Sequence, residues 1–107
     1  MGRSAQRKGA DGERELANLL KEYGFAVRRG QVFNHESDMV GLDKIHPEVK
    51  RVEKLNVPAA MRQAVTEAQI RKDGTPTLFH RRNREEWLVT MRLTDWIELY
   101  RLWNEVN

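Results

Sequence analysis

The chain has 107 residues, of which 39% are hydrophobic and 33% charged, with 19 lysines and arginines against 16 aspartates and glutamates. This length predicts one domain over residues 1–107, too small for a large cofactor cavity or a second catalytic lobe. No apolar run is long enough to span a bilayer, and residues 1–8 lack the apolar core of a secretory signal, so neither a membrane protein nor a secreted one is expected. The lack of cysteine excludes disulfide frameworks, thiolate metal sites and a cysteine nucleophile, and it favours a reducing cytoplasm.

Basic residues occur in short clusters near the ends of the predicted elements. This spacing suits a surface that follows a phosphate backbone, and the net charge of +3 has the matching sign. Composition alone explains the clusters equally well as ordinary solvated charge. The clustered residues are Arg3, Arg7, Lys8, Arg28, Arg29, Lys50, Arg51, Lys54, Arg71, Lys72, Arg81, Arg82 and Arg84.

The chain is expected to begin with a flexible basic arm over residues 1–8 and to continue as a helix from Asp11. Asp11 can cap this helix, and Gly24 ends it. Apolar residues recur in it at helical spacing, which predicts a buried stripe. They are Leu16, Leu19, Leu20 and Tyr23.

The segment between residues 25 and 52 predicts a compact meander of three short strands. A polar, irregular stretch separates the first strand from the second, and a tight turn over 41–44 separates the second from the third. Pro47 argues against a central ladder position, so the third strand should be irregular or edge-like near its start. The strands are expected at 25–29, 37–40 and 45–52.

The second half of the chain predicts a helix, two strands and a last helix. Asn56 is a good N-cap for a helix that ends near Lys72, strands follow at 75–81 and 86–91, and Thr94 caps the last helix. The resulting order predicts an α/β sandwich with a mixed sheet flanked by helices.

Aromatic residues form one face of the last helix. Trp96, Tyr100 and Trp103 recur at four and three residues, the spacing of a buried stripe or a dimer seam. Stacking on unpaired bases is a second possibility. We favour a packing role for this face.

Two carboxylates and a lysine carry the most informative pattern. Glu48 and Lys50 fall on one face of the third strand, and Asp38 on the preceding strand can approach them. Glu13 or Glu15, on the first helix, can add a further carboxylate. Oxygen ligands of this kind suit Mg²⁺, which typically binds one or two carboxylates plus a substrate phosphate, as phosphodiester hydrolysis requires.

The Asp-x₉-Glu-x-Lys spacing alone is a weak signal in a chain that is one-third charged. A solvated face explains it as well, and Lys50 could be a surface lysine that protects an edge strand. First-turn glutamates favoured by the helix dipole would explain Glu13 and Glu15. Strand placement, the upstream glutamates, the basic clusters and the lack of competing catalytic groups together favour a site.

Four ordered blocks resemble the archaeal-type Holliday junction resolvases, of the PD-(D/E)xK nuclease superfamily. They are Arg7-Lys-Gly-Ala-Asp-Gly-Glu-Arg-Glu-Leu16, Gly24-Phe-Ala-Val-Arg-Arg29, Asp38 and Glu48-Val-Lys50. The second half of the chain also resembles small nucleases of bacterial prophages. Two departures are Ser37, at a position where the superfamily often has proline, and the short interval between Asp38 and Glu48.

The resemblance implies a restriction-endonuclease-like αβββαβ core and a metal-dependent DNA endonuclease, a homodimer that resolves branched DNA in the cytoplasm of a bacterium or a phage-infected cell. It implies Mg²⁺ or Mn²⁺ bound by Glu13, Asp38, Glu48 and Val49, with Lys50 catalytic. Gln63 is a further accessory candidate. The DNA-binding candidates are Arg7, Lys8, Arg14, Arg29, Arg51, Lys54, Arg81 and Arg82.

Other readings remain. A structure-tolerant or nicking nuclease of a mobile element is one alternative, and a non-catalytic DNA-binding module on the same fold is another. His35, His46 and His80 do not have the spacing of a helical zinc pair, so no zinc site is expected.

Overall fold

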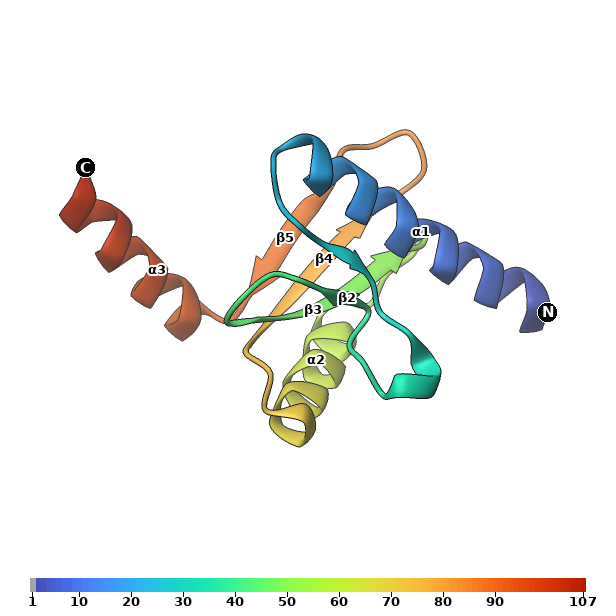
Figure 1. The fold of residues 1–107 in the computed structure, drawn as a ribbon. Coiled ribbons are helices and arrows are strands. Elements are labelled where there is room, and N and C mark those ends of the chain that lie inside the picture. Colours follow the sequence, from blue (N-terminus) through green and yellow to red (C-terminus); the bar gives the residue numbers. More distant parts are fainter. Residues whose placement is uncertain (1) are drawn as a thin grey trace.

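The computed structural model describes residues 2–107 and the surroundings of side chains from residue 9 onward. A mixed sheet lies between two helices, and a third helix extends away from this body (Figure 1). The helices are α1 (Gly2–Glu22), α2 (Val57–Arg71) and α3 (Leu93–Val106), and the sheet contains β3 (Ile45–Arg51), β4 (Thr75–Arg81) and β5 (Leu88–Met91).

The order β3-β4-β5 makes β3 one edge of the sheet and β4 its centre. β3 runs parallel to β4, from Ile45 opposite Thr75 to Arg51 opposite Arg81, and α2 is the crossover that a parallel pair requires. β5 returns antiparallel to β4. The predicted α/β fold with a mixed sheet is confirmed, and Pro47 lies on an edge strand as expected.

The first two strands form a sheet of their own, so the predicted three-strand meander is wrong. Among the strands of residues 2–107, β1 (Arg28–Arg29) and β2 (Met39–Val40) pair only with each other, with a 3-10 turn, η1 (Val32–Asn34), between them. On the side facing them, the N–H of Val49 in β3 donates to the Asp38 carboxylate at 2.8 Å. A side chain therefore takes a position that a neighbouring strand would occupy in a continuous meander.

The expected start of the first helix at Asp11 is wrong, because α1 begins at Gly2 and includes all but the first residue of the predicted arm. Asp11 is compatible with a helix interior, and no proline among residues 2–10 prevents the helix from extending back. The side chains of Arg7 and Lys8, two predicted DNA-binding residues, lie outside the described residues.

Alternation along β3 divides its side chains between the two helices. Val49 points toward α1 and packs in a core with Leu16, Ala17, Val27 and Met39. On the opposite face the sheet is covered by α2, whose buried residues are all small: Ala60, Ala64 and Ala68. Short side chains let this helix lie close to the sheet.

Glu15 fastens α1 to the sheet through three partners. Its carboxylate accepts from Arg81 at 2.6 and 2.9 Å and from the Trp87 indole N–H at 3.0 Å, and Arg51 lies 3.3 Å away. The Arg81 guanidinium also lies 5.7 Å from the centre of the Trp87 ring. Glu15 is therefore part of the packing between α1 and the sheet.

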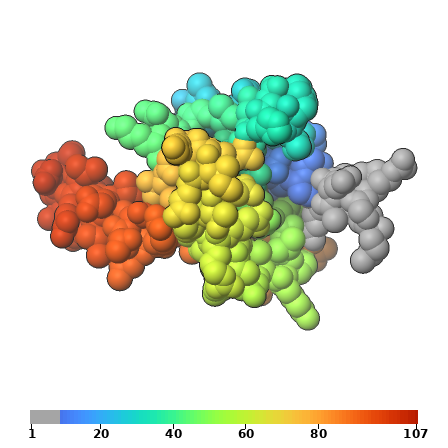
Figure 2. Space-filling view, turned by 90° about the horizontal axis from the view of Figure 1, so that it is seen from below, coloured from blue at the N-terminus to red at the C-terminus, as the bar shows by residue number. Residues whose placement is uncertain are grey.

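Helix α3 extends away from the body at one end of the molecule (Figure 2). Packing of its aromatic face against the chain's own core is not observed, because none of its residues is buried. Trp96 stacks on Tyr100 at 5.2 Å between ring centres, yet 49% of Trp96 and 60% of Trp103 remain exposed. The aromatic face of α3 therefore stays largely exposed in the single chain.

We predict that Gly30→Ala destabilises the fold by about 3 kcal/mol in urea denaturation. A Cβ at residue 30 would lie 1.6 Å from the backbone oxygen of Ser37, and the Gly30 N–H donates to the backbone carbonyl oxygen of Asp38 at 2.9 Å. Backbone next to Asp38 would have to move. Gly9→Ala in α1 is the control, because its Cβ meets nothing within 4 Å and should stabilise by about 0.5 to 1 kcal/mol. Equal stability of Gly30→Ala and wild type would contradict this account.

Candidate active site

A pocket of about 370 Å³ opens at the free edge of β3. Glu13 from α1, Asp38 from the segment before β2, Glu48 and Lys50 from β3, and Gln63 from α2 all line it. The structure thus brings together side chains from four segments that are far apart in sequence. All four predicted catalytic residues are among them.

Asp38 is fixed by the backbone of β3. Its Oδ2 accepts from the Val49 N–H at 2.8 Å. Burial raises the pKa of Asp38, and this hydrogen bond partly opposes the effect. Since the N–H and C=O of one strand residue point to the same edge, the Val49 carbonyl also faces the pocket that Val49 lines.

Glu48 is the most buried carboxylate of the group. It is only 2% exposed, its Oε1 lies 3.5 Å from the Lys50 ammonium, and its Oε2 has no hydrogen-bond partner among the described residues. Burial, and next the negative charge of Asp38, raise the pKa of Glu48 to about 7. The free Oε2 is a buried acceptor that a cation would satisfy.

Glu13 and Glu15 point to different surroundings, which separates the two candidates. Glu13 lines the pocket, and its Oε1 accepts from the Arg29 guanidinium at 2.8 Å. Burial raises the pKa of Glu13, while the Arg29 hydrogen bond acts against that shift. Glu15 instead holds Arg81 and Trp87, away from Asp38. Of the two, only Glu13 has a position from which it can join Asp38 and Glu48.

The donor set fits a divalent cation. Three carboxylates and one backbone carbonyl border the pocket, and the oxygen chemistry of this set is the kind that Mg²⁺ and Mn²⁺ accept. The orphaned Oε2 of Glu48 is an independent sign of the same fit.

The predicted DNA-binding arginines are mostly engaged in ion pairs. Arg29 contacts Glu13, and Arg51 and Arg81 contact Glu15. Arg14 pairs with Asp11 at 3.0 Å on the surface, where most of its side chain stays exposed. Two of the predicted residues, Lys54 and Arg82, also lie exposed, Arg82 at 4.0 Å from Glu85.

Sequence reasoning missed two residues next to this pocket. Glu67 of α2 and His46 of β3 each bring a ligand atom within 4.8 Å of Glu48. His46 precedes Glu48 by two residues and so shares its face of the strand, a signal that period-two alternation could have given. Gln63, the predicted accessory residue, lies 3.5 Å from Glu67.

No helix formed by residues 2–107 has the length and apolar character needed to cross a membrane.

We predict that the metal-free chain loses stability as the pH rises from about 5 to 8, and that Glu48→Gln removes part of this loss. A folded-state pKa raised from 4.5 to about 7 favours the protonated form. The stabilisation by protonated Glu48 is complete below the pKa that this residue has in the unfolded chain, and it disappears as the pH rises through about 7. The free energy of unfolding should change by about 3 kcal/mol at most. Urea denaturation in EDTA at several pH values measures it.

The control for this pH experiment is Glu98→Gln, an exposed glutamate on α3. This variant should keep the wild-type pH dependence. The same slope in Glu48→Gln and wild type would contradict the assignment.

A family model described as archaeal Holliday junction resolvase (Hjc) matches residues 4–105. No curated protein matches the chain. The matched range contains Glu13, Asp38, Glu48 and Lys50, and the mixed sheet between helices is consistent with a restriction-endonuclease-like fold. The chain therefore belongs to the archaeal Holliday junction resolvase family of nucleases.

Proposed function

We propose that this protein is a metal-dependent endonuclease that hydrolyses phosphodiester bonds in Holliday junctions or other branched DNA. The observation that carries the proposal is the convergence of Glu13, Asp38, Glu48 and Lys50 on one pocket at the edge of β3. Family membership supports the nuclease class and the branched substrate. An origin in a phage or a bacterium stays a prediction of the sequence resemblance.

The three carboxylates and the Val49 carbonyl would hold Mg²⁺, or Mn²⁺, at the mouth of the pocket. A bound ion of this kind polarises a scissile phosphate and lowers the pKa of a bound water. Asp38 is held in place by the β3 backbone, and Glu13 by Arg29, so both carboxylates are positioned before any ligand arrives.

Lys50 adds a positive charge to the pocket. Its ammonium lies 3.5 Å from Glu48 and its side chain is 31% exposed, so it can reach both the carboxylate and an incoming phosphate. In this position the lysine would orient the attacking water or stabilise the negative charge that develops on the phosphate. Arg29 acts on the reaction through Glu13, which makes it a positioning residue.

DNA would approach the pocket at the open edge of β3. Arg14 on α1 and Lys54 after β3 are exposed and offer positive charge for contacts with phosphates. The arginines that form ion pairs with Glu13 and Glu15 hold these carboxylates in position and remain positively charged themselves. Each phosphate that such residues neutralise releases counterions and adds to affinity.

We further propose that two copies pair through α3. The helix presents an apolar face on which Trp96, Leu99 and Trp103 are 49%, 49% and 60% exposed, and none of its residues is buried. An exposed apolar face of this kind marks a protein interface. A homodimer would set two active sites on one branched molecule, one for each strand to be cut.

We predict that Asp38→Asn lowers junction cleavage by about 100-fold or more, because a neutral amide loses the metal ligand while still accepting from the Val49 N–H. Fold and DNA affinity should remain near normal. Asp43→Asn makes the same change at an exposed turn position and should cleave like wild type. Normal cleavage by Asp38→Asn would show that this pocket is not the catalytic site.

The substrates for this assay are a labelled four-way junction, a matched linear duplex and a flap, each with Mg²⁺ and with EDTA. Symmetric, metal-dependent cuts in the junction are the expected result. Equal cleavage of all three substrates would favour the structure-tolerant nuclease. Junction binding without cleavage would favour the non-catalytic module and overturn the proposal.

We predict that Trp103→Glu weakens self-association by about 30-fold or more, because a buried tryptophan at a protein interface contributes roughly 2 kcal/mol. Since no residue of α3 is buried against the body, the sheet with α1 and α2 should stay folded. Sedimentation velocity over a concentration series measures the change. Arg101→Glu, on the face where Arg101 lies 3.5 Å from Glu98, is the control and should associate like wild type. A monomeric wild-type chain would contradict the dimer.

A further inference from the structure

A second group of potential ligands lies between β3 and α2. His46 and Glu48 are two residues apart on one face of β3, and Glu67 projects from α2. One ligand atom from each lies within 4.8 Å of the other two. His46 and Glu67 lie outside the four sequence blocks that carry the family resemblance, and neither has a role in the reaction described above.

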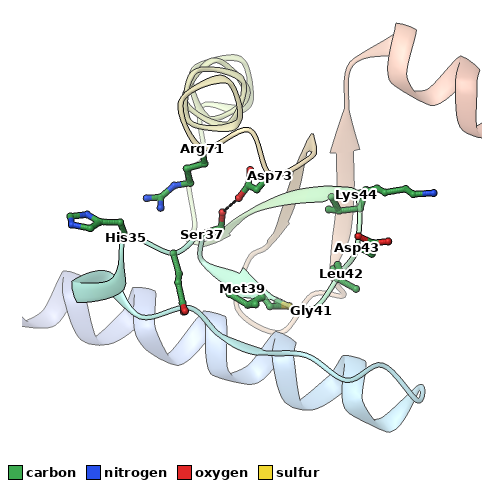
Figure 3. A pocket seen from close by; sticks show the side chains of 12 residues that line it. His35, Ser37, Met39, Gly41, Leu42, Asp43, Lys44, Arg71 and Asp73 are labelled. Carbon is green, nitrogen blue, oxygen red and sulfur yellow. Dashed lines mark hydrogen bonds between the residues drawn. The ribbon is translucent and has the colours of Figure 1, made fainter.

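The His46 ring is completely buried and its orientation is fixed. Its Nδ1 lies 2.7 Å from the Asp73 carboxylate and 3.1 Å from the Ser37 hydroxyl. Ser37 also donates to Asp73, and the two side chains point toward each other in the lining of a pocket of about 500 Å³ (Figure 3). Ser37, which stands where the superfamily often has proline, thus takes part in holding this ring.

The Asp73 contact decides which nitrogen of neutral His46 carries the proton. An ionised carboxylate only accepts hydrogen bonds, so Nδ1 is the donor to Asp73. Nε2 then keeps its lone pair. A carboxylate behind a histidine in this way is the usual outer partner of a metal-binding imidazole, because it fixes the tautomer and raises the basicity of the ligand nitrogen.

Two buried atoms of this group have no hydrogen-bond partner among the described residues. They are Nε2 of His46 and Oε2 of Glu48, in residues that are 0% and 2% exposed. An unpaired buried acceptor costs about 1 to 3 kcal/mol. Two such acceptors, on residues whose ligand atoms lie within 4.8 Å of each other and of Glu67, match the ligand set of a single cation.

The ligand chemistry selects the class of ion. Mg²⁺ and Ca²⁺ bind oxygen, whereas an imidazole nitrogen suits the divalent first-row transition ions. A neutral imidazole and two ionised carboxylates carry two negative charges, which one divalent ion neutralises. We propose that His46 Nε2, Glu48 and Glu67 bind a divalent first-row transition-metal ion, with Asp73 orienting His46, beside the pocket of Glu13, Asp38 and Lys50 and sharing Glu48 with it.

The test is Mn²⁺ binding to the full chain without DNA. Calorimetry measures the affinity, and pulsed electron paramagnetic resonance identifies the nuclei next to the bound ion. The expected spectrum shows coupling of bound Mn²⁺ to a nitrogen nucleus, and His46→Gln should remove that coupling. Glu67→Gln should weaken this class of Mn²⁺ binding by about 10-fold or more. Glu67 is only partly buried, so the variant should fold even if His46→Gln does not.

Two controls separate this site from the proposed nuclease site. Asp38→Asn should keep the nitrogen coupling while cleavage is lost, and Glu22→Gln, an exposed glutamate on α1, should leave Mn²⁺ binding unchanged. Mg²⁺ should compete for this ion only weakly. Bound Mn²⁺ without nitrogen coupling in the wild-type chain, or unchanged binding in Glu67→Gln, would overturn the proposal and leave the nuclease assignment untouched.

Discussion

The architecture depends on one edge strand held between two helices. Because β3 pairs in parallel with β4, the chain needs the α2 crossover, and the alternation of β3 then sends Val49 to the α1 core and Glu48 toward α2. The free edge of the same strand receives Asp38 on the Val49 N–H. A single run of residues, β3, therefore positions both the hydrophobic core and the acidic pocket. A shift in the pairing register of β3 would disrupt both.

Much of the secondary structure could be predicted from local signals. Asn56 caps α2 through the Ala59 N–H, and the strands at 45–51 and 75–81 follow from their composition and from the turn residues around them. Partner choice between strands could not be predicted, since pairing of β3 with β4 depends on contacts distant in sequence. The start of α1 was missed because a capping residue permits a helix start without requiring one.

For the candidate site, spacing identified Asp38, Glu48 and Lys50, and resemblance selected Glu13. The structure adds a physical reason for the last choice, because Glu15 is occupied by Arg81 and Trp87 on another side of α1. Glu67 and Asp73 could not be found in this way. Each approaches β3 only through the tertiary placement of α2 and the turn after it, which no local pattern encodes.

Helix α3 has a consequence for how the protein folds. An isolated helix of 14 residues is marginal in water, and none of the residues of α3 is buried by its own chain. In the proposed dimer, the order of α3 would depend on contacts between molecules, so the law of mass action would link its folding to protein concentration. Dilution would melt the C-terminal segment while the sheet and its two covering helices persist, and the chain would unfold in two separate steps instead of one.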